Sequence, residues 1–468
     1  MKRFIPLALV ASLLLASPAA AETKTETYTV GPITVGPYQV KQAIDFGIPK
    51  PPEDAWITAM DVDVVDRPGG QQVPIDRLML HHVVFANLGR VLGERRDGTC
   101  SNFTSLDSMT TLPGAGERFY GAGEERARLT LPPGYAYQSY GADTWLITWM
   151  LMNHRAETDA AYIQYHVTYD TEPKTQVKPY WLDEKNCLSD PVFNAPGGGK
   201  PGSTYRRSTT WTVPESGRIV AGGGHVHGGA KNLVLQRAAC GPEGHVYTSR
   251  PLWGNPDHPF YNVRPILHEP GPVNMSGFLS AEGFHVSRGE KLRLDANYDG
   301  ELPHTRVMGI MLVFLVPDES VSGGCVPPPA DLADYASTAP GRTSAPRFKV
   351  PLTGIGPDGN ARTIKKPPGR RTRVAGGTTI KVGSQYFSKP NVKLAAGGWL
   401  NWVFEGGELH NVTVANGPRG FSSVNLNGGR DFRKRLKEPG TYQLFCGLHP
   451  VTMTSTVKVV AKQKRHKK

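Results

Sequence analysis

The chain has 468 residues, a formal net charge of +12 at pH 7, 53 glycines and 40 prolines. This length predicts roughly two to four domains, and the spread of glycine and proline favours many short strands joined by turns over helices. Part of the charge lies in the segments KKPPGRRTR (365–373) and KQKRHKK (462–468), and because no nucleic-acid-binding motif accompanies them, the charge does not indicate a nucleic-acid partner.

The first 21 residues have the pattern of an export signal. A basic start is followed by an apolar run from Phe4 to Ala16 and by small residues before Glu22. We expect cleavage after about Ala21. No other run is apolar and long enough to predict a transmembrane segment. The chain is therefore expected in the periplasm or in the secreted fraction.

The body of the chain predicts an all-β fold. Strand-like runs recur from ETYTVGPITV (26–35) to VMGIMLVFLV (307–316), with turn residues between them. We expect two packed antiparallel β-sandwiches, residues 22–174 and 175–325, because roughly 300 residues are many for one sandwich. A Pro-, Ala- and Ser-rich linker, 326–375, with a short extended segment RFKVPL (347–352), precedes a third β-sandwich at 376–461 and a basic tail at 462–468.

Histidines occur in an ordered series in the first two units. His81 and His82 are adjacent in a strand-like run, so they would need a strand end or a bulge to face one ion. His166 follows in YIQYHVTY. His225 and His227 are two residues apart in a glycine-rich strand, so both imidazoles can reach one ion.

This series, followed by Met308 at the start of an apolar strand, resembles the copper type II monooxygenases, the family of the peptidylglycine alpha-hydroxylating and dopamine beta-monooxygenases. The resemblance implies an electron-transfer copper site and a catalytic copper site that binds dioxygen. The first would consist of His81, His82 and His166, and the second of His225, His227 and Met308. LHHVVFANLGR and HVHGGAKNL also resemble a stress-up-regulated nodulin-type family with no established reaction.

Two positions in this assignment have competitors. His154, in LMNHR, is an alternative to His166 as the third ligand of the first site. Met311 or His304 is an alternative to Met308 in the second site.

The C-terminal unit contains a separate ligand pattern. His410 in LHNVTV is followed by Cys446, His449 and Met453 in FCGLHPVTM. A thiolate, two imidazoles and a thioether are the donors of a blue-copper site. Strand-like runs flank the cysteine loop, so one turn can present three ligands to His410.

Residues from about 376 to 460 resemble the plastocyanin-type cupredoxins, which implies a Greek-key β-sandwich and a type 1 copper ion. The resemblance includes Asn411, which in that family typically ties the two ligand loops together. Gly447 and Leu448 separate Cys446 from His449, and the loop from His449 to Met453 differs slightly from that of plastocyanin.

If Cys446 binds copper, four cysteines remain, an even set for two disulfides in an oxidising compartment. All three pairings are open. We favour Cys100 with Cys187 and Cys240 with Cys325, which roughly keeps each bridge within one half of the first two units.

The sequence thus predicts an exported copper protein in which a type 1 electron-transfer domain is fused to a monooxygenase-like unit that hydroxylates C–H bonds with dioxygen. A monooxygenase needs two electrons per turnover and each copper supplies one, so two further coppers and an electron-feeding cupredoxin form a consistent set. The expected partners are a redox protein or a small reductant, and a small-molecule substrate. The alternatives are a non-catalytic envelope copper-binding or electron-carrier protein, and an adhesion or scaffold module in which only the cupredoxin is active.

Overall fold

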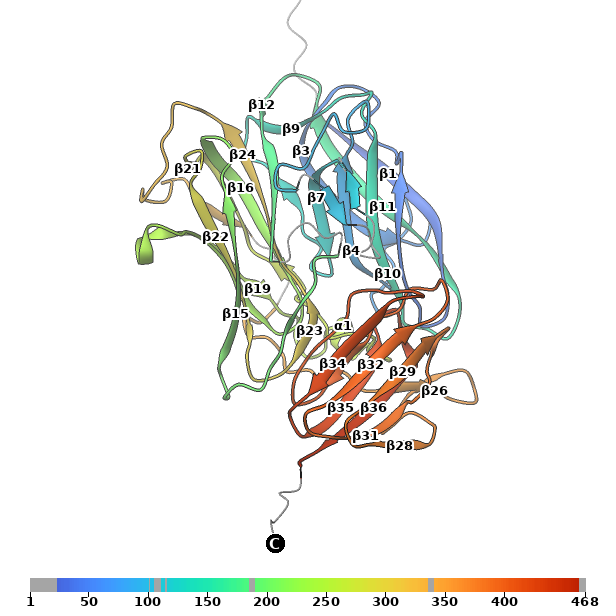
Figure 1. The fold of residues 1–468 in the computed structure, drawn as a ribbon. Coiled ribbons are helices and arrows are strands. Elements are labelled where there is room, and N and C mark those ends of the chain that lie inside the picture. Colours follow the sequence, from blue (N-terminus) through green and yellow to red (C-terminus); the bar gives the residue numbers. More distant parts are fainter. Residues whose placement is uncertain are drawn as a thin grey trace, which may run out of the picture.

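The computed structural model describes residues 23–100, 102–104, 111–113, 116–184, 190–335 and 341–462. The predicted all-β fold is confirmed. Within the described ranges the helices are the short α1 (Pro259–Asn262) and the 3-10 helix η1 (Gly241–Gly244). Three β-sandwich units are visible in Figure 1, with the third, in orange and red, below the other two.

The first sandwich has two sheets, with orders β1-β11-β3-β9-β12 (β8 pairing with β3) and β2-β10-β4-β7. Alternation in β11 turns Ile163, Tyr165 and Val167 into the core. The strands of this unit, with the separate hairpin β5-β6, are β1 (Thr23–Val35), β2 (Val40–Phe46), β3 (Ala55–Val65), β4 (Leu78–Asn87), β5 (Asn102–Thr104), β6 (Thr111–Pro113), β7 (Glu117–Gly123), β8 (Leu129–Thr130), β9 (Tyr135–Ser139), β10 (Trp145–Asn153), β11 (Asp159–Asp170) and β12 (Thr175–Gln176).

The second sandwich pairs the sheet β13-β24-β16-β21-β25 with the sheet β15-β22-β17-β18, and adds the pairs β14-β23 and β19-β20. Val220 and Phe314 of this unit pack into the core of the first sandwich, so the two units share a buried apolar interface. Its strands are β13 (Lys178–Asp183), β14 (Phe193–Ala195), β15 (Thr204–Thr212), β16 (Gly217–Val226), β17 (Ala230–Arg237), β18 (His245–Ser249), β19 (Pro251–Leu252), β20 (Asn274–Met275), β21 (Gly277–Val286), β22 (Lys291–Asp299), β23 (His304–Val307), β24 (Gly309–Pro317) and β25 (Ala333–Tyr335).

The third sandwich has the sheets β28-β31-β36-β35-β33 and β30-β29-β32-β34, with the hairpin β26-β27 before them. Met79, Met150 and Met152 of the first sandwich join its apolar core cluster, so the third unit is packed against the first. Its strands are β26 (Thr353–Ile355), β27 (Ala361–Thr363), β28 (Arg371–Val374), β29 (Gly377–Gly383), β30 (Tyr386–Phe387), β31 (Asn391–Ala395), β32 (Gly398–Phe404), β33 (Thr413–Asn416), β34 (Asp431–Leu436), β35 (Gly440–Cys446) and β36 (His449–Val460).

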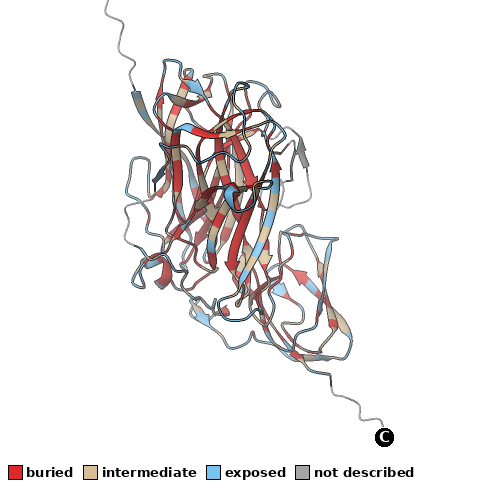
Figure 2. Ribbon diagram, turned by 90° about the vertical axis from the view of Figure 1, so that its left-hand side faces the viewer, coloured by how far each residue is buried: buried red, intermediate tan, exposed pale blue. Residues whose placement is uncertain are grey.

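The predicted linker, 326–375, contains paired strands. Its β25 pairs with β21 of the second sandwich, and its β28 pairs with β31 as an edge strand of the third. The segment 347–352 forms no strand. Pro346 and Pro351 flank or interrupt it, and a proline has no N–H to donate to a ladder. Figure 2 shows the buried positions running along the strands of the two larger sandwiches, with exposed loops around them.

The predicted bridge between Cys240 and Cys325 is confirmed. Cys446 is a free, buried thiol. Cys100 is disulfide-bonded, whereas Cys187 lies outside the described residues, as do the predicted signal at 1–21 and nearly all of the basic tail. No helix of the described ranges has the length and apolar character needed to cross a membrane.

Candidate metal centres

Three of the four predicted type 1 ligands converge on one point. The Nδ1 atoms of His410 and His449 are 3.2 Å apart, and the Cys446 sulfur lies 3.9 Å from the first and 3.8 Å from the second. Cys446 ends β35 and His449 begins β36, so the turn between these strands carries two of the ligands. Met453 follows on β36 and is fully buried in the same apolar cluster.

Asn411 ties the two ligand loops together. Its backbone N–H donates to the Cys446 sulfur at 3.3 Å, and its side-chain oxygen accepts from the Gly447 backbone N–H at 2.7 Å. Its side-chain nitrogen donates to the Asn425 oxygen at 2.9 Å. The link implied by the family resemblance is present.

The donors of this centre fit a copper ion. Burial lowers the pKa of both His410 and His449, which favours the neutral imidazole that binds a metal. Burial raises the pKa of the Cys446 thiol, so a bound cation would have to displace its proton. Two nitrogens each about 2 Å from one ion are separated by about 3 Å, close to the spacing of the two Nδ1 atoms.

The adjacent pair His81 and His82 lies on β4, at a β-bulge. In the ladder with β10, Met150 pairs with His82 but Leu151 pairs with Leu80, so His81 is the extra residue. A bulge lets consecutive side chains depart from strict alternation. Both imidazoles are buried, and their ring centroids are 5.3 Å apart. The sequence predicted that this pair would need a strand end or a bulge to face one ion, and the structure has a bulge there.

His225 is the last residue but one of β16, and His227 directly follows the end of this strand at Val226. Their Nε2 atoms are 3.1 Å apart, again the spacing of two nitrogens on one ion. The other nitrogen of each ring is oriented by the protein: His225 Nδ1 lies 3.0 Å from a Glu125 carboxylate oxygen, and His227 Nδ1 lies 3.0 Å from the Arg306 carbonyl oxygen. Such outer contacts fix the tautomer and direction of a metal-binding imidazole.

The structure brings members of the two predicted histidine sets together. The rings of His81 and His227 are 5.1 Å apart, across the interface of the first two sandwiches. Three further side chains join them. They are Glu124, Glu125 and His268, and with His81, His82, His225 and His227 they form what we term the histidine cluster.

Glu124 is the centre of one side of this cluster. Its carboxylate lies 2.6 Å from His81 Nδ1 and also contacts His268 Nε2, and these three groups could hold an ion. The sequence interpretation missed Glu124, Glu125 and His268. A signal was available in GAGEER, because glycines before adjacent carboxylates allow close approach. A Cβ at Gly123 would lie 2.7 Å from the His225 ring and 2.8 Å from the Glu125 carboxylate.

Burial and charge hold most of the cluster's imidazoles neutral. Burial, and then the charge of neighbouring histidines, lowers the pKa of His82 and His227 well below its usual value. Burial opposes protonation of His225 as well, but the Glu125 carboxylate outweighs it and raises that pKa. Although burial acts against it, His268 and His81 hold the pKa of Glu124 well below its usual range. The cluster thus offers neutral imidazoles beside carboxylates, which suits a divalent ion.

The other histidines predicted as ligands of the first site lie outside the histidine cluster or at its edge. His166 lies on β11, in the other sheet of the first sandwich, where its Nδ1 contacts Asp61 at 2.7 Å; the structure does not bring it to His81 and His82. The core-facing neighbours of His166 in β11 are buried, so alternation turns His166 outward. His154 is buried against the Pro265 carbonyl, near His268, and its pKa is lowered to about 4 by burial and then by that histidine.

Met308 lines the same cavity as His82 and His225. It precedes Gly309, which pairs with Val226, so it lies at the end of the β16–β24 ladder, next to the cluster. The alternative Met311 is fully buried in the core of the second sandwich. The alternative His304 contacts Glu269 at 2.8 Å, and although burial acts against it, that carboxylate and Asp299 raise its pKa to about 9.

Comparison with known proteins gives two partial relationships, and no family model matches the chain. The chain is 30% identical over 79 residues to amicyanin-alpha of Methylorubrum extorquens, covering 16% of this chain and 66% of that protein. It is 26% identical over 180 residues to a probable copper-dependent oxygenase M1 of a Phoma species, covering 36% of this chain and 41% of that protein. The relationships support a copper protein. The chain thus spans under two thirds of either relative.

Solved amicyanin structures are also similar to part of the chain. A Cu(I) form of an amicyanin mutant shows 19% identity and a TM-score of 0.17, covering 18% of this chain and 83% of that one. Together with the two relatives, the donor sets described above are consistent with an electron-transfer or oxygenase-like role.

Proposed function

We propose that this chain is an exported copper oxygenase in which the C-terminal type 1 domain delivers electrons to copper held by the histidine cluster. The proposal extends to hydroxylation of a C–H bond with dioxygen, with a small reductant or a redox protein as the external donor. The observation that carries it is the position of the type 1 ligand loop directly beside the histidine cluster.

A small cavity of about 70 Å³ lies between the two centres. His81, His227 and His268 line it from the cluster, and Gly447 and Leu448 line it from the loop between two type 1 ligands. Residues of the cluster and of the type 1 ligand loop therefore border the same small space. Short packed contacts of this kind favour one-electron transfer within the molecule.

Arg306 contacts both centres. Its carbonyl oxygen accepts from His227 Nδ1 at 3.0 Å, and its guanidinium donates to the Ser423 carbonyl of the third sandwich at 3.3 Å. Its Cδ lies 3.6 Å from the position of a Cβ at Gly447. Arg306 has a φ of 53°, which is uncommon for a residue with a side chain. Contacts at both ends hold this conformation, a pattern expected where backbone strain supports function.

The third sandwich is held in this orientation by polar and apolar contacts. The Thr305 hydroxyl donates to the Val414 carbonyl at 2.8 Å, and the Gly420 N–H donates to the Pro196 carbonyl at 2.8 Å. On the other side, methionines of β4 and β10 pack into its core cluster. A domain held in one orientation is suited to electron transfer within the molecule, whereas a freely diffusing electron carrier would not need these contacts.

Copper would supply one-electron redox chemistry and, at the histidine cluster, a position for dioxygen. His410, Cys446, His449 and Met453 would hold the type 1 ion, and His225 and His227 with Met308 would hold the catalytic one. His81 and His82 are available for a further ion, with the Glu124 carboxylate 2.6 Å from His81 Nδ1. A thioether at the catalytic site favours the reduced metal.

The test is copper content and oxygen use of the mature full-length chain. Wild type should bind more than one copper, turn blue with Cu(II) and consume oxygen when a reductant is present. His227→Ala should lose copper and oxygen consumption while it keeps the blue colour, because the type 1 ligands are untouched. His245→Ala is the matched control, since the His245 side chain is exposed and its one hydrogen bond among the described contacts is to the Thr248 hydroxyl at 2.8 Å.

A rapid-mixing measurement tests the route itself. Fully reduced wild type mixed with dioxygen should regain blue colour as the type 1 ion gives its electron to the cluster, and His227→Ala should regain it much more slowly. If wild type binds a single copper and consumes no oxygen, the chain is better described as a copper-binding or electron-carrier protein.

A further inference from the structure

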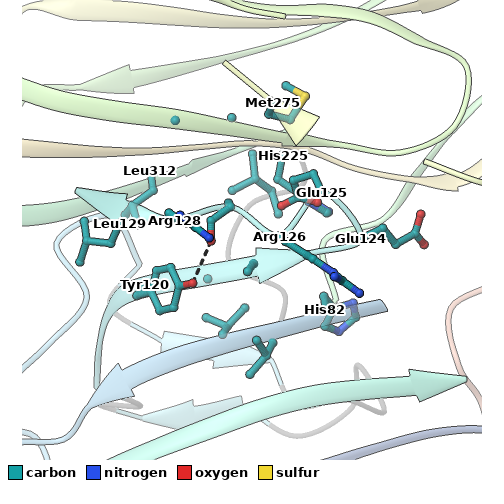
Figure 3. A pocket seen from close by; sticks show the side chains of 18 of the residues that line it. His82, Tyr120, Glu124, Glu125, Arg126, Arg128, Leu129, His225, Met275 and Leu312 are labelled. Atoms are coloured by element: carbon teal, nitrogen blue, oxygen red, sulfur yellow. Dashed lines mark hydrogen bonds and ion pairs between the residues drawn. The ribbon is translucent and has the colours of Figure 1, made fainter. Parts of the chain in front are cut away.

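A large cavity opens on the side of the histidine cluster away from the type 1 domain. It encloses about 1210 Å³ between the first two sandwiches. His82, His225 and Met308 line it, and Figure 3 shows the labelled His82, Glu124, Glu125 and His225 around this space. Small-molecule sites usually occupy about 300–1000 Å³, so this cavity exceeds the ordinary size.

Most of the wall is apolar. Strands of both sandwiches contribute aliphatic and aromatic side chains to it. Examples are Ile44, Val84, Leu129, Ile310, Leu312 and Phe314. Figure 3 shows Leu129 of β8 and Leu312 of β24 near Tyr120, whose hydroxyl donates to the Ala127 carbonyl at 2.8 Å. That hydroxyl is therefore already engaged with the protein.

Four of the five Asp, Glu, Lys or Arg side chains of the wall are paired with the protein, whereas the fifth, Arg128, is exposed. Arg118 lies 2.8 Å from an Asp97 carboxylate oxygen and stacks over the Trp181 ring at 4.7 Å. Arg126 lies 3.4 Å from an Asp63 carboxylate oxygen. Because these charges are compensated, the wall favours a neutral ligand over an ionic one.

The rim of the cavity is also apolar. Phe46 and Leu92 both line it, and they are 64% and 73% exposed. Large apolar side chains grouped at the mouth of an apolar cavity mark a binding site better than isolated ones do.

We infer that this cavity binds the substrate, and that the substrate is a large, neutral, predominantly apolar molecule of polycyclic or long-chain type. This inference rests on the proposed function, because it takes the histidine cluster at the cavity wall as the reacting centre. Apolar walls would exclude water from the C–H bond presented there and would hold the molecule by burial alone.

Gly223 offers a way to close the cavity without touching a ligand of either centre. It lies on β16 in the cavity wall, and a Cβ there would have one neighbour within 4 Å, the Tyr335 hydroxyl at 3.6 Å. A methyl group fits this position. A phenyl ring would project into the cavity and occupy part of it.

The experiment uses metal-free full-length chain, N-phenyl-1-naphthylamine as a neutral fluorescent probe, and competition by a sterol, a long-chain alcohol and a short hydrophilic peptide amide. Wild type should bind the probe, and the sterol or the alcohol should displace it while the peptide amide does not. Gly223→Phe should weaken binding by about tenfold or more, and Gly223→Ala by less than about threefold. Leu312→Asn, which replaces an apolar wall group by a polar one, gives a second variant if the bulky one fails to fold.

The inference is overturned if wild type does not bind the probe, if the folded wall variants bind it as wild type does, or if the hydrophilic peptide amide is the better competitor. Failure of the proposed function is a separate result. Probe binding by metal-free protein, combined with no oxygen consumption by copper-loaded protein, would remove the oxygenase and leave an apolar-ligand site. Oxygen consumption without probe binding would remove only the substrate class.

Discussion

Replacing Asn411 with alanine should loosen the type 1 centre and destabilise the third sandwich. The side chain is 1% exposed and makes three hydrogen bonds, accepting from Gly447 N–H at 2.7 Å and Thr413 Oγ1 at 2.8 Å and donating to Asn425 at 2.9 Å. Thr413 and Asn425 are themselves buried and would be left without these partners. At about 1–3 kcal/mol for each orphaned buried group, the unfolding free energy of this unit should fall by about 3 kcal/mol.

The assay is hydrogen exchange of metal-free protein in peptides that cover β35 and β36, because these strands report on the third sandwich alone. Copper titration of the same variant should show an affinity about 10-fold to 100-fold weaker, since Asn411 orients the ligand loops from outside the metal shell. Asn416→Ala is the control. Its side-chain nitrogen donates to the Gln443 side-chain oxygen at 2.8 Å and to the Val350 carbonyl at 2.5 Å, away from the ligands. Because Asn416 is only half-buried, the change should cost about 1 kcal/mol and leave the colour intact. Unchanged exchange and unchanged copper affinity in Asn411→Ala would refute the role given to this residue.

Three further outcomes follow from other contacts. Cys446→Ser should abolish the blue colour of Cu(II)-loaded protein, whereas Met453→Leu should keep it and raise the reduction potential, as visible spectra and redox titration would show. Burial raises the pKa of Glu184 to about 9, above its value in the unfolded chain. The folded protein therefore favours the protonated carboxyl, and the stability that this group contributes is complete below the unfolded pKa and is lost as the pH rises toward 9. At pH 8 the unfolding free energy of Glu184→Gln should therefore exceed that of wild type by on the order of 3 kcal/mol. The variant should melt at a higher temperature at that pH, and the two melting temperatures should converge near pH 4. The double change Cys240→Ser and Cys325→Ser removes a disulfide between cysteines 85 residues apart in sequence. Chemical denaturation should show an unfolding free energy lower by about 4 kcal/mol or less, and an unchanged value would contradict the idea that the bridge restricts the unfolded chain.

The type 1 ligands could be predicted from the sequence because they are nearly local. Cys446 ends β35, and His449 and Met453 lie on β36 directly after the turn, so their spacing brings them close and only His410 has to be supplied by another part of the sheet. The sequence therefore predicted the β fold of the C-terminal unit and the approach of His410, Cys446 and His449 to one another. The first strand of this unit was not predicted, because the basic, proline-flanked segment that contains Arg371–Val374 has the composition of a linker and pairs only through β31.

The spacing of residues in the sequence could not predict the full membership of the histidine cluster. The bulge at His81 depends on register with β10, and register is set by packing over the whole sheet rather than by the residues of β4. Glu124 and His268 are 144 residues apart and meet only because two sandwiches pack together. His166 matched the family pattern in sequence, yet alternation in β11 turned it to the outer face of its sheet.

Neighbouring residues of the cluster face different spaces, and this division has a consequence for the proposed reaction. His82 and His225 line the large cavity, whereas His81 and His227 line the small cavity beside the type 1 loop. A substrate in the large cavity would approach the cluster from one side while electrons arrive from the other. Because the two routes do not share a space, a bound substrate would not displace the electron donor, and closing the large cavity at Gly223 should leave the return of blue colour after reoxidation unchanged. His81 and His82, adjacent on β4, line the small and the large cavity respectively, so this pair lies where the proposed electron route and the proposed substrate route meet.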